Sequence, residues 1–321
     1  MREIFESCRC PYCLEQANPG IKVGETLFFS CPRCLLAFRA GLEEPENVLR
    51  MQQYYENDFF RELAWDQLEG YRDEIFREAL DRIEGQAGRG RLLDVGCGCG
   101  FFLREALARG WDVKGLDPSR ESIDYLNAML GDVGIVGTLD DCDPGERYDV
   151  ITMINVLDHL IDPWGSVEKA AALLNPGGLL YVRVPNGHFH MNLFRLMRAW
   201  GLGNKAGRVV VFHNYAMSAA WLDRMLTDRG LTAVEIRNAG ISEFDGYRRR
   251  NGKIRAMRLL RRAVWRSAKS IEHLSAGTLL WGPSLEVTAR KQGISPVRHL
   301  RSDSGKRHPV HPSAGAKGTL S

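Results

Sequence analysis

The stretch Leu92-Leu93-Asp94-Val95-Gly96-Cys97-Gly98-Cys99-Gly100 places an apolar run, an acidic residue and three alternate glycines in direct succession. The apolar residues are typical of a buried parallel strand, and glycine lets a backbone turn pass close to a ligand. Residues 101–109 predict a helix whose free amide groups point at the same place. The sequence therefore predicts a nucleotide-binding turn between a strand and a helix.

A second predicted strand, residues 111–117, ends in Asp117, at the distance where βαβ nucleotide folds place a carboxylate on a ribose hydroxyl. The glycine spacing differs from the Gly-x-Gly-x-x-Gly of dinucleotide dehydrogenases, and Asp94 precedes the glycines. The stretch resembles motif I of the class I S-adenosylmethionine-dependent methyltransferases.

The resemblance covers residues 91–236. Residues 148–155 resemble the fourth strand of that family, Val156 to Pro163 its Leu-Glu-His-x-x-x-Pro segment, and Leu174 to Gly178 the turn before its fifth strand. Asp158 stands where glutamate is commoner. The resemblance implies an α/β fold: a doubly wound, mostly parallel seven-stranded sheet with helices on both faces. Its sixth strand is expected at 231–237 and an antiparallel seventh at 284–290.

Acidic and amide side chains at the predicted strand ends are expected to meet the cofactor in one crevice. Asp94 would face its cationic amino group and Asp117 its ribose, while Asp140 or Asp141 would meet the adenine amino group. A solvated loop or a helix cap is the alternative role for each acid. The predicted cofactor-binding set is Asp94, Gly96, Cys97, Gly98, Gly100, Asp117, Pro118, Asp140, Asp141 and Asn155.

Two Cys-x2-Cys pairs near the N-terminus, Cys10/Cys13 and Cys31/Cys34, have zinc-ribbon spacing. Four thiolates make a closed site suited to a structural Zn²⁺, whose binding would stabilise a segment too short and polar to fold alone. A disulfide framework is the competing interpretation, but residues 1–8 are charged and lack the apolar core of a secretory signal. Cys8 either replaces Cys10 or stays free. Cys97 and Cys99 are expected to be small buried residues of the glycine turn.

Histidines supply the candidate proton acceptors, because imidazole titrates near neutral pH. A base is required only if the acceptor is a hydroxyl or a carbon that must lose its proton. His159 is the first candidate because it follows the fourth strand, and His188 and His213 come next. The latter two belong to a long connection, residues 186–214, that is expected to cover the substrate. A surface or capping role is the alternative for each.

The remaining segments predict the domain organisation. The zinc-ribbon-like module is assigned to residues 1–41, a helical linker or cap to 42–90, and the methyltransferase domain to 91–291. Within that domain, residues 240–283 form a basic helical insertion, and its stretch from Tyr247 to Lys269 carries ten Lys or Arg and no acid. Such a helix binds RNA, an anionic membrane surface or an acidic substrate, or simply packs on the domain. Residues 292–321 are expected to be disordered.

The composition also predicts where in the cell the protein is found. The 321 residues are 44% hydrophobic with a formal net charge of +3, and no run of eighteen apolar residues predicts a membrane span. We therefore expect a cytoplasmic protein without a transmembrane segment, for which peripheral membrane contact stays open. The oligomeric state does not follow from the sequence.

The function predicted from these features is methyl transfer from S-adenosylmethionine to an O, C or N acceptor on a small molecule, glycan or lipid precursor. An RNA methyltransferase that uses the ribbon and the basic helix is the first alternative. Asn155-Val156-Leu157-Asp158 lacks the Asn/Asp-Pro-Pro-aromatic motif of enzymes that methylate exocyclic base nitrogens, which disfavours part of that class. A non-catalytic interaction protein with a relic methyltransferase fold is the second alternative.

Overall fold

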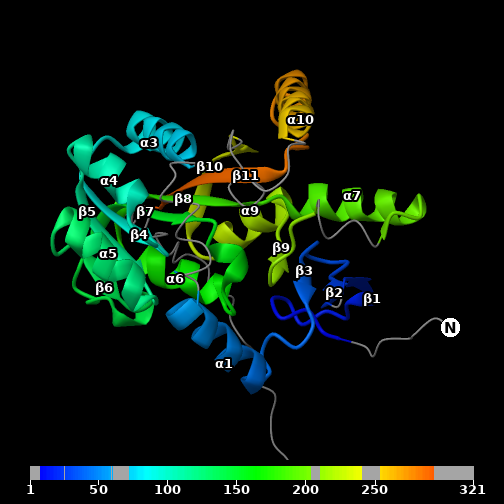
Figure 1. Ribbon diagram of the computed structural model, residues 1–321, viewed down its shortest axis with the longest axis horizontal. Helices are drawn as coiled ribbons and strands as arrows, with labels where there is room; N and C mark the ends of the chain where they lie inside the picture. Colours follow the sequence, from blue (N-terminus) through cyan, green and yellow to red (C-terminus); the bar gives the residue numbers. More distant parts are fainter. Residues whose placement is uncertain are drawn as a thin grey trace, which may run out of the picture.

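The structure is a computed structural model, and it describes residues 8–24, 26–58, 60, 72–203, 210–240 and 254–292. Its centre is a seven-stranded sheet made of β4 Arg91–Val95, β5 Asp112–Asp117, β6 Gly134–Val136, β7 Tyr148–Ile154, β8 Leu174–Pro185, β10 Leu231–Asn238 and β11 Ser284–Lys291. The strand order is β10-β11-β8-β7-β4-β5-β6 (Figure 1). β11 runs antiparallel to both of its neighbours, β10 and β8, and every other neighbouring pair in this sheet is parallel. The predicted doubly wound, mostly parallel sheet is confirmed.

Helices cover both faces of this sheet because successive strand residues point to opposite sides. Leu92 packs in one apolar cluster with α3 Asp73–Ala87, α4 Phe101–Ala108 and α5 Arg120–Leu130. Its neighbour Leu93 packs in the other cluster, with α6 Pro163–Leu173 and α9 Ala219–Thr227. The core is therefore divided into two layers by the sheet.

The segment 42–90 is largely helical where the structure describes it. It contains α1 Pro45–Gln53, the π-helical turn η1 Tyr54–Asp58, and α3. Gly85 lies inside α3, which continues to Ala87 and ends at Gly88, whose φ of 70° suits a residue without a Cβ.

The N-terminal module has a small antiparallel sheet of its own, with β1 Asn18–Val23, β2 Thr26–Ser30 and β3 Ala37–Arg39. Its fourth strand, β9 Tyr215–Ala216, comes from the far half of the chain and pairs with β3 (Figure 1). The module thus shares one sheet with the segment that precedes α9. Part of the long connection predicted over 186–214 is instead regular, because α7 occupies Gly187–Ala199.

The last helix, α10 Ile254–Leu274, stands out from the sheet near β10 and β11 (Figure 1). The Trp265 indole N–H donates to the Ala239 carbonyl (3.1 Å), and Ala268 is buried, so part of the helix packs on the domain as one of the predicted alternatives requires. Residues 241–253, which begin the basic stretch, and the tail beyond 292 lie outside the described residues. None of the described helices is both long and apolar enough to cross a membrane.

Candidate active site and four-cysteine cluster

The glycine turn after β4 requires residues without a Cβ. Gly96, Gly98 and Gly100 have φ values of 70°, 51° and 77°, in the left-handed region that other residues rarely adopt. Gly98 N–H donates to Asp117 Oδ2 (2.9 Å), which joins the turn to the end of β5. A Cβ on Gly100 would lie 2.1 Å from a Leu126 methyl carbon, so α5 packs directly against the turn.

Asp94 lies inside β4, and its side chain is only 3% exposed. The Thr152 hydroxyl of the neighbouring β7 donates to Asp94 Oδ1 (2.6 Å). Burial raises the pKa of Asp94, the Thr152 hydrogen bond lowers it and the nearby Asp117 carboxylate raises it, and together they bring it to about 7. A cation placed beside this carboxylate would offset the free-energy cost of burying its negative charge.

Asp117 closes β5 and is followed by Pro118 in the turn to α5. Its two oxygens accept from the backbone N–H groups of Gly98 and Ser119, both at 2.9 Å. Burial raises the pKa of Asp117, although those hydrogen bonds oppose the shift. The residue therefore fixes the glycine turn whether or not it also meets a ribose.

Asp140 and Asp141 lie in the 3-10 turn η2 Leu139–Asp141, and both have local partners. The Asp141 carboxylate accepts from the Thr138 backbone N–H (2.7 Å) and closes a capping box with that residue. Asp140 is exposed and forms an ion pair with Lys169. The capping role weighed for these acids is therefore present at Asp141, and their contact with adenine stays a prediction.

Asn155 follows β7 with a φ of 56°, a left-handed conformation that asparagine tolerates better than most residues. Its Oδ1 accepts from Arg183 Nη1 (2.7 Å), while its backbone N–H donates to the Arg183 carbonyl (2.8 Å). The second Arg183 nitrogen donates to the Gly240 carbonyl (3.0 Å). Arg183 thus ties the end of β7 to β8 and to the chain after β10.

Cys97 and Cys99 are buried, as the sequence predicted. Burial raises the pKa of both thiols, to about 12 for Cys99, so they stay protonated. The Cys97 sulfur also lies 2.7 Å from a Cβ built on Gly115, which shows how tightly the thiol fills the turn. These cysteines pack the glycine turn and offer no thiolate to a metal.

Asp158, His159 and His213 form one cluster at the carboxyl edge of the sheet. Asp158 and His159 belong to the 3-10 turn η3 Leu157–His159 after β7, and His213 precedes β9. His213 Nδ1 and Asp158 Oδ2 are 2.5 Å apart, and the rings of His159 and His213 stack with centroids 3.7 Å apart. Because a carboxylate only accepts hydrogen bonds, Nδ1 of His213 carries a proton, and in a neutral ring this leaves Nε2 as the acceptor.

The Asp158 side chain is 1% exposed, and its Oδ1 has no hydrogen-bond partner among the described residues. Ligand atoms of Asp158, His159 and His213 lie within 4.8 Å of one another, close enough for a metal ion. The stacked rings do not aim two nitrogen lone pairs at one point, however. The short Asp158–His213 contact therefore favours a hydrogen-bonded carboxylate–imidazole pair.

Tyr55, from η1, contacts this cluster through His159. Its hydroxyl lies 2.7 Å from His159 Nδ1. Burial raises the pKa of Tyr55, and the charges of Tyr54, Asp158 and Asp117 add to the shift. Burial also lowers the pKa of His159 to about 4, which keeps its ring neutral at pH 7.

The three candidate histidines do not come together as one group. His188, near the start of α7, is exposed, hydrogen-bonds with Asn192 (2.9 Å) and packs edge-on against Trp281. Neither His159 nor His213 is among its neighbours in these contacts. His188 is therefore not a candidate proton acceptor at the Asp158–His213 cluster.

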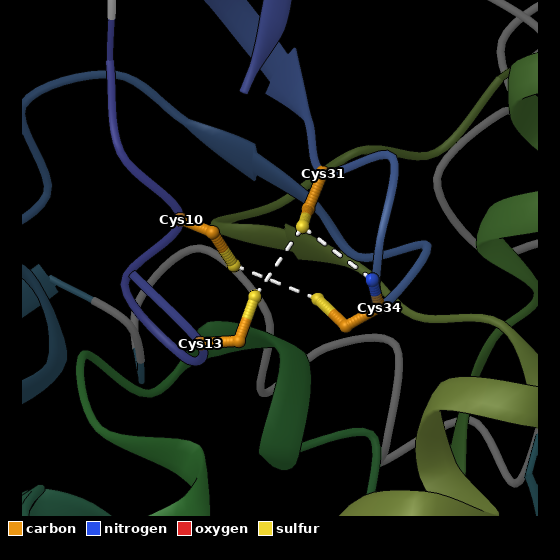
Figure 2. A group of neighbouring side chains, drawn as sticks. All are labelled: Cys10, Cys13, Cys31 and Cys34. Atoms are coloured by element: carbon orange, nitrogen blue, oxygen red, sulfur yellow. Dashed lines mark hydrogen bonds between the residues drawn. The ribbon is translucent and has the colours of Figure 1, made fainter. Parts of the chain in front are cut away.

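Figure 2 shows the four cysteines of the N-terminal module converging from two turns. The sulfurs of Cys10 and Cys34 are 3.5 Å apart, as are those of Cys13 and Cys31, and all four lie within 4.8 Å of one another. Four sulfurs bound to one zinc ion at about 2.3 Å would be separated by about 3.8 Å, so this arrangement fits a tetrahedral metal site. Cys8 is outside the cluster, with its thiol 3.6 Å from the Arg9 carbonyl.

The two cysteine turns have the same backbone geometry. Leu14 N–H donates to the Cys10 carbonyl and Leu35 N–H to the Cys31 carbonyl, and both leucines have a φ of 60°. The Cys34 amide also donates to the Cys31 sulfur (3.4 Å). A hydrogen bond from the Cys34 thiol lowers the pKa of Cys10 to about 5.

The module contacts the histidine cluster through the backbone next to β9. Arg39 N–H donates to the Asn214 carbonyl (2.8 Å), and Asn214 N–H donates to the Asp158 carbonyl (3.1 Å). The Asn214 side chain also donates to the His159 carbonyl. One residue beside His213 therefore joins the module, the 3-10 turn and the candidate proton acceptor.

Sequence reasoning missed several partners in this site. Asp158 was noted only as a substitute for glutamate, and Tyr55 was assigned no role. Thr152 and Arg183 carried no signal, because hydrogen bonding between neighbouring strands depends on register. The resemblance around Asp158 was the one signal that could have identified its role.

The sequence matches a known protein family. The family described as "Methyltransferase domain" matches residues 68–236, just over half of the chain. The chain therefore belongs to the methyltransferase domain family, as its motifs predicted.

Two relatives are named ubiquinone biosynthesis O-methyltransferase. The protein of Bradyrhizobium sp. (strain ORS 278) is 36% identical over 101 residues, which cover 30% of this chain and 40% of that protein. The protein of Azoarcus sp. (strain BH72) is 28% identical over 193 residues, or 55% of this chain and 82% of that protein. The chain thus spans well under two thirds of the first of these relatives.

A solved structure shares the fold. It is the 1,6-didemethyltoxoflavin-N1-methyltransferase of Burkholderia thailandensis, with 1,6-didemethyltoxoflavin and S-adenosylhomocysteine bound. Sequence identity is 15%, the TM-score is 0.51, and the match covers 85% of this chain and 99% of the other. At this identity the similarity shows the fold alone.

Proposed function

We propose that this protein is an S-adenosylmethionine-dependent methyltransferase that methylates a hydroxyl group on a small molecule or lipid precursor. The Asp158–His213 pair carries the proposal. A hydroxyl acceptor must lose its proton, and the imidazole of this pair can accept it. The names of the Bradyrhizobium and Azoarcus relatives support an oxygen acceptor.

The cofactor would be held at the glycine turn. Asp94, buried beside one hydroxyl donor and near a second carboxylate, suits the cationic amino group of S-adenosylmethionine. Asp117 and the adjacent turn suit the ribose, and the amino end of α4 points at the same place. When bound, S-adenosylmethionine supplies an electrophilic methyl group on a sulfonium ion.

In this proposal His213 is the general base. Asp158 holds the imidazole by its Nδ1–H, so Nε2 faces the acceptor hydroxyl and takes its proton as the new O–C bond forms. Asp158 would also stabilise the positive charge that His213 acquires. The neutral His159 ring, hydrogen-bonded to Tyr55 and stacked on His213, acts as a positioning residue.

We further assign the four-cysteine cluster to a structural Zn²⁺. The sulfur set is soft and closed, and the sulfur–sulfur distances suit tetrahedral coordination, which leaves no ligand position for a substrate. The metal would hold the two cysteine turns and, through β3, the pairing with β9.

Calorimetry with S-adenosylmethionine tests the enzyme assignment. We expect binding of the cofactor by the full chain, and absence of binding at millimolar cofactor would contradict the proposal. A methyl-transfer screen with labelled cofactor over hydroxylated small molecules, glycans and bulk RNA then identifies the acceptor class. Methylation of RNA alone, with salt-sensitive binding to tRNA, would replace the small-molecule acceptor by the RNA alternative.

His213→Asn and Asp158→Asn test the base once an acceptor is found. Each is expected to lower kcat by about a hundredfold, a typical contribution of general base catalysis, without changing cofactor affinity. His273→Asn, which alters an exposed histidine on α10, is the matched control and should keep wild-type kcat. Undiminished kcat in His213→Asn would remove this residue from the mechanism.

A further inference from the structure

A cavity of about 500 Å³ lies where the four-cysteine module meets the methyltransferase domain. Its walls come from the second cysteine turn, the first half of α7, the start of α9 and the loop before β11. The residues placed above at the cofactor and base sites do not line it, namely Asp94, Asp117, Asn155, Asp158, His159 and His213. Its volume falls within the range of about 300–1,000 Å³ common for small-molecule sites.

Buried hydrogen bonds hold the walls of this cavity in place. The Asn186 side chain, 1% exposed, donates to the carbonyls of Leu280 (3.0 Å) and Gly282 (2.9 Å) and so fixes the loop before β11. At the start of α7, Gly187 N–H donates to the Met217 carbonyl (2.7 Å). These hydrogen bonds between protein groups therefore organise two walls of the cavity.

Apart from Cys31 of the four-cysteine cluster, Arg195 is the ionisable group of fixed charge among the described lining residues. Arg195, on α7, is the only lysine or arginine among them, and they include no aspartate or glutamate. Arg195 makes no ion pair with a described residue. Ser218 and the first turn of α9 add the partial positive charge of a helix N-terminus, and Asn192 offers a side-chain amide.

Large apolar side chains lie beside these polar groups. Leu35, Leu279 and Trp281 line the cavity, yet they remain 59%, 51% and 45% exposed. Exposed apolar groups that gather around a cavity mark a binding site more often than scattered ones do. The His188 ring stands edge-on to Trp281, with centroids 6.1 Å apart, and provides a second flat surface.

We propose that this cavity is a second binding site, which takes a small molecule that carries a phosphate or carboxylate group on an apolar body. The anionic group contacts Arg195, and the apolar body packs against Leu279 and Trp281. Because its residues are separate from the cofactor and base sites, this proposal does not depend on the proposed function.

Three probes of one shape test the proposal by calorimetry on the full chain. They are 1-naphthyl phosphate, 1-naphthoate and the neutral 1-naphthol. We expect the phosphate or the carboxylate to bind at least tenfold more tightly than naphthol, and the two anions show which group the site prefers. Binding of naphthol as tight as that of both anions, or no binding of either anion at millimolar concentration, would overturn the proposal.

Five variants locate the binding. Arg195→Gln is expected to weaken anion binding at least tenfold and leave naphthol binding unchanged, whereas Arg198→Gln, on the same helix and not in the lining, leaves both unchanged. Leu35→Asp places a negative charge in the wall and should abolish anion binding. Leu35→Asn keeps the shape without the charge and should retain it, and Leu14→Asp, at the equivalent position of the first cysteine turn, is the control.

Anion binding that survives both Arg195→Gln and Leu35→Asp would place the probe elsewhere and refute the site. Circular dichroism and S-adenosylmethionine binding are measured on every variant. Loss of anion binding in a folded variant that still binds the cofactor supports the cavity proposal alone, and failure of all forms to bind the cofactor contradicts only the proposed function.

Discussion

Asp94 combines burial, one hydroxyl partner and a second carboxylate nearby, so its negative charge is poorly compensated without a ligand. Such a group costs stability in the free protein and favours binding of a cation. Its pKa of about 7 means that the side chain gains a proton as the pH falls below neutrality. Cofactor binding at this residue should therefore depend on pH in the physiological range.

The first prediction follows from the sign of this shift. Below pH 7 the bound cation must displace the Asp94 proton, so the Kd for S-adenosylmethionine is expected to rise up to tenfold per pH unit between pH 7 and 5.5. Calorimetry across this range measures the change. A flat wild-type profile would contradict the role of Asp94.

Asp94→Asn supplies the comparison, because it keeps the shape and removes the charge. We expect cofactor affinity about tenfold to a hundredfold lower, from loss of a charge-assisted contact of about 1.5–3 kcal/mol. Its pH profile should be flatter than that of the wild type, because the Asp94 carboxyl no longer titrates. The free variant should be at least as stable as the wild type in urea denaturation, since a buried carboxylate has gone.

Element by element, the sequence predicted the large sheet and gave no strands for the small one. The buried runs of β4, β5, β7 and β8 and the glycine turn were clear, because local apolar pattern and turn chemistry specify them. β9 has two residues, and its partner β3 lies in the first forty residues of the chain, so no local pattern could reveal the pairing. The same reason hid the Asp158–His213 pair, whose members are 55 positions apart.

Gly187 is the point where α7 meets β9. A Cβ built on Gly187 would lie 2.3 Å from the Ala216 carbonyl carbon and 2.6 Å from the Met217 nitrogen, and these are backbone atoms that cannot turn away. Gly187→Ala is therefore expected to lower the free energy of unfolding by about 2–4 kcal/mol. Urea denaturation measures the loss.

Gly85→Ala is the matched control, since a Cβ at this position within α3 meets no atom within 4 Å. It should raise the free energy of unfolding by about 0.5–1 kcal/mol, because alanine is the better helix former. Equal effects of the two substitutions would mean that the α7–β9 contact does not limit stability.

Across the whole molecule, the four-cysteine module is docked and not merely tethered. Tyr12, between the first two cysteines, packs edge-on against Trp164 and Trp221 with centroids 5.6 and 5.5 Å apart. Its hydroxyl donates to Asp228, and the Arg229 guanidinium lies over its ring at 5.5 Å. Loss of the metal or of a cysteine from this cluster should therefore alter the packing of the methyltransferase domain.

The prediction at this scale concerns metal removal. Cys34→Ser, or chelation of the bound metal, is expected to lower kcat at least tenfold while the Kd for S-adenosylmethionine stays within twofold. The reason is that β3 and Arg39 hold Asn214 beside His213, whereas Asp94 and Asp117 belong to the large sheet. Cys142→Ser, outside the cluster, is the control for substitution of a cysteine. An unchanged kcat in metal-free protein would show that the four-cysteine module does not help to position His213.

The pairing of β3 with β9 also sets an order of events during synthesis. The four-cysteine module is synthesised before β9, so its sheet is completed only when Tyr215 and Ala216 follow, after most of the large sheet has been made. Until then β3 presents an unpaired edge to other nascent chains. A chain truncated before residue 215 would keep this edge of β3 unpaired. Such fragments are therefore expected to aggregate more readily than the full chain.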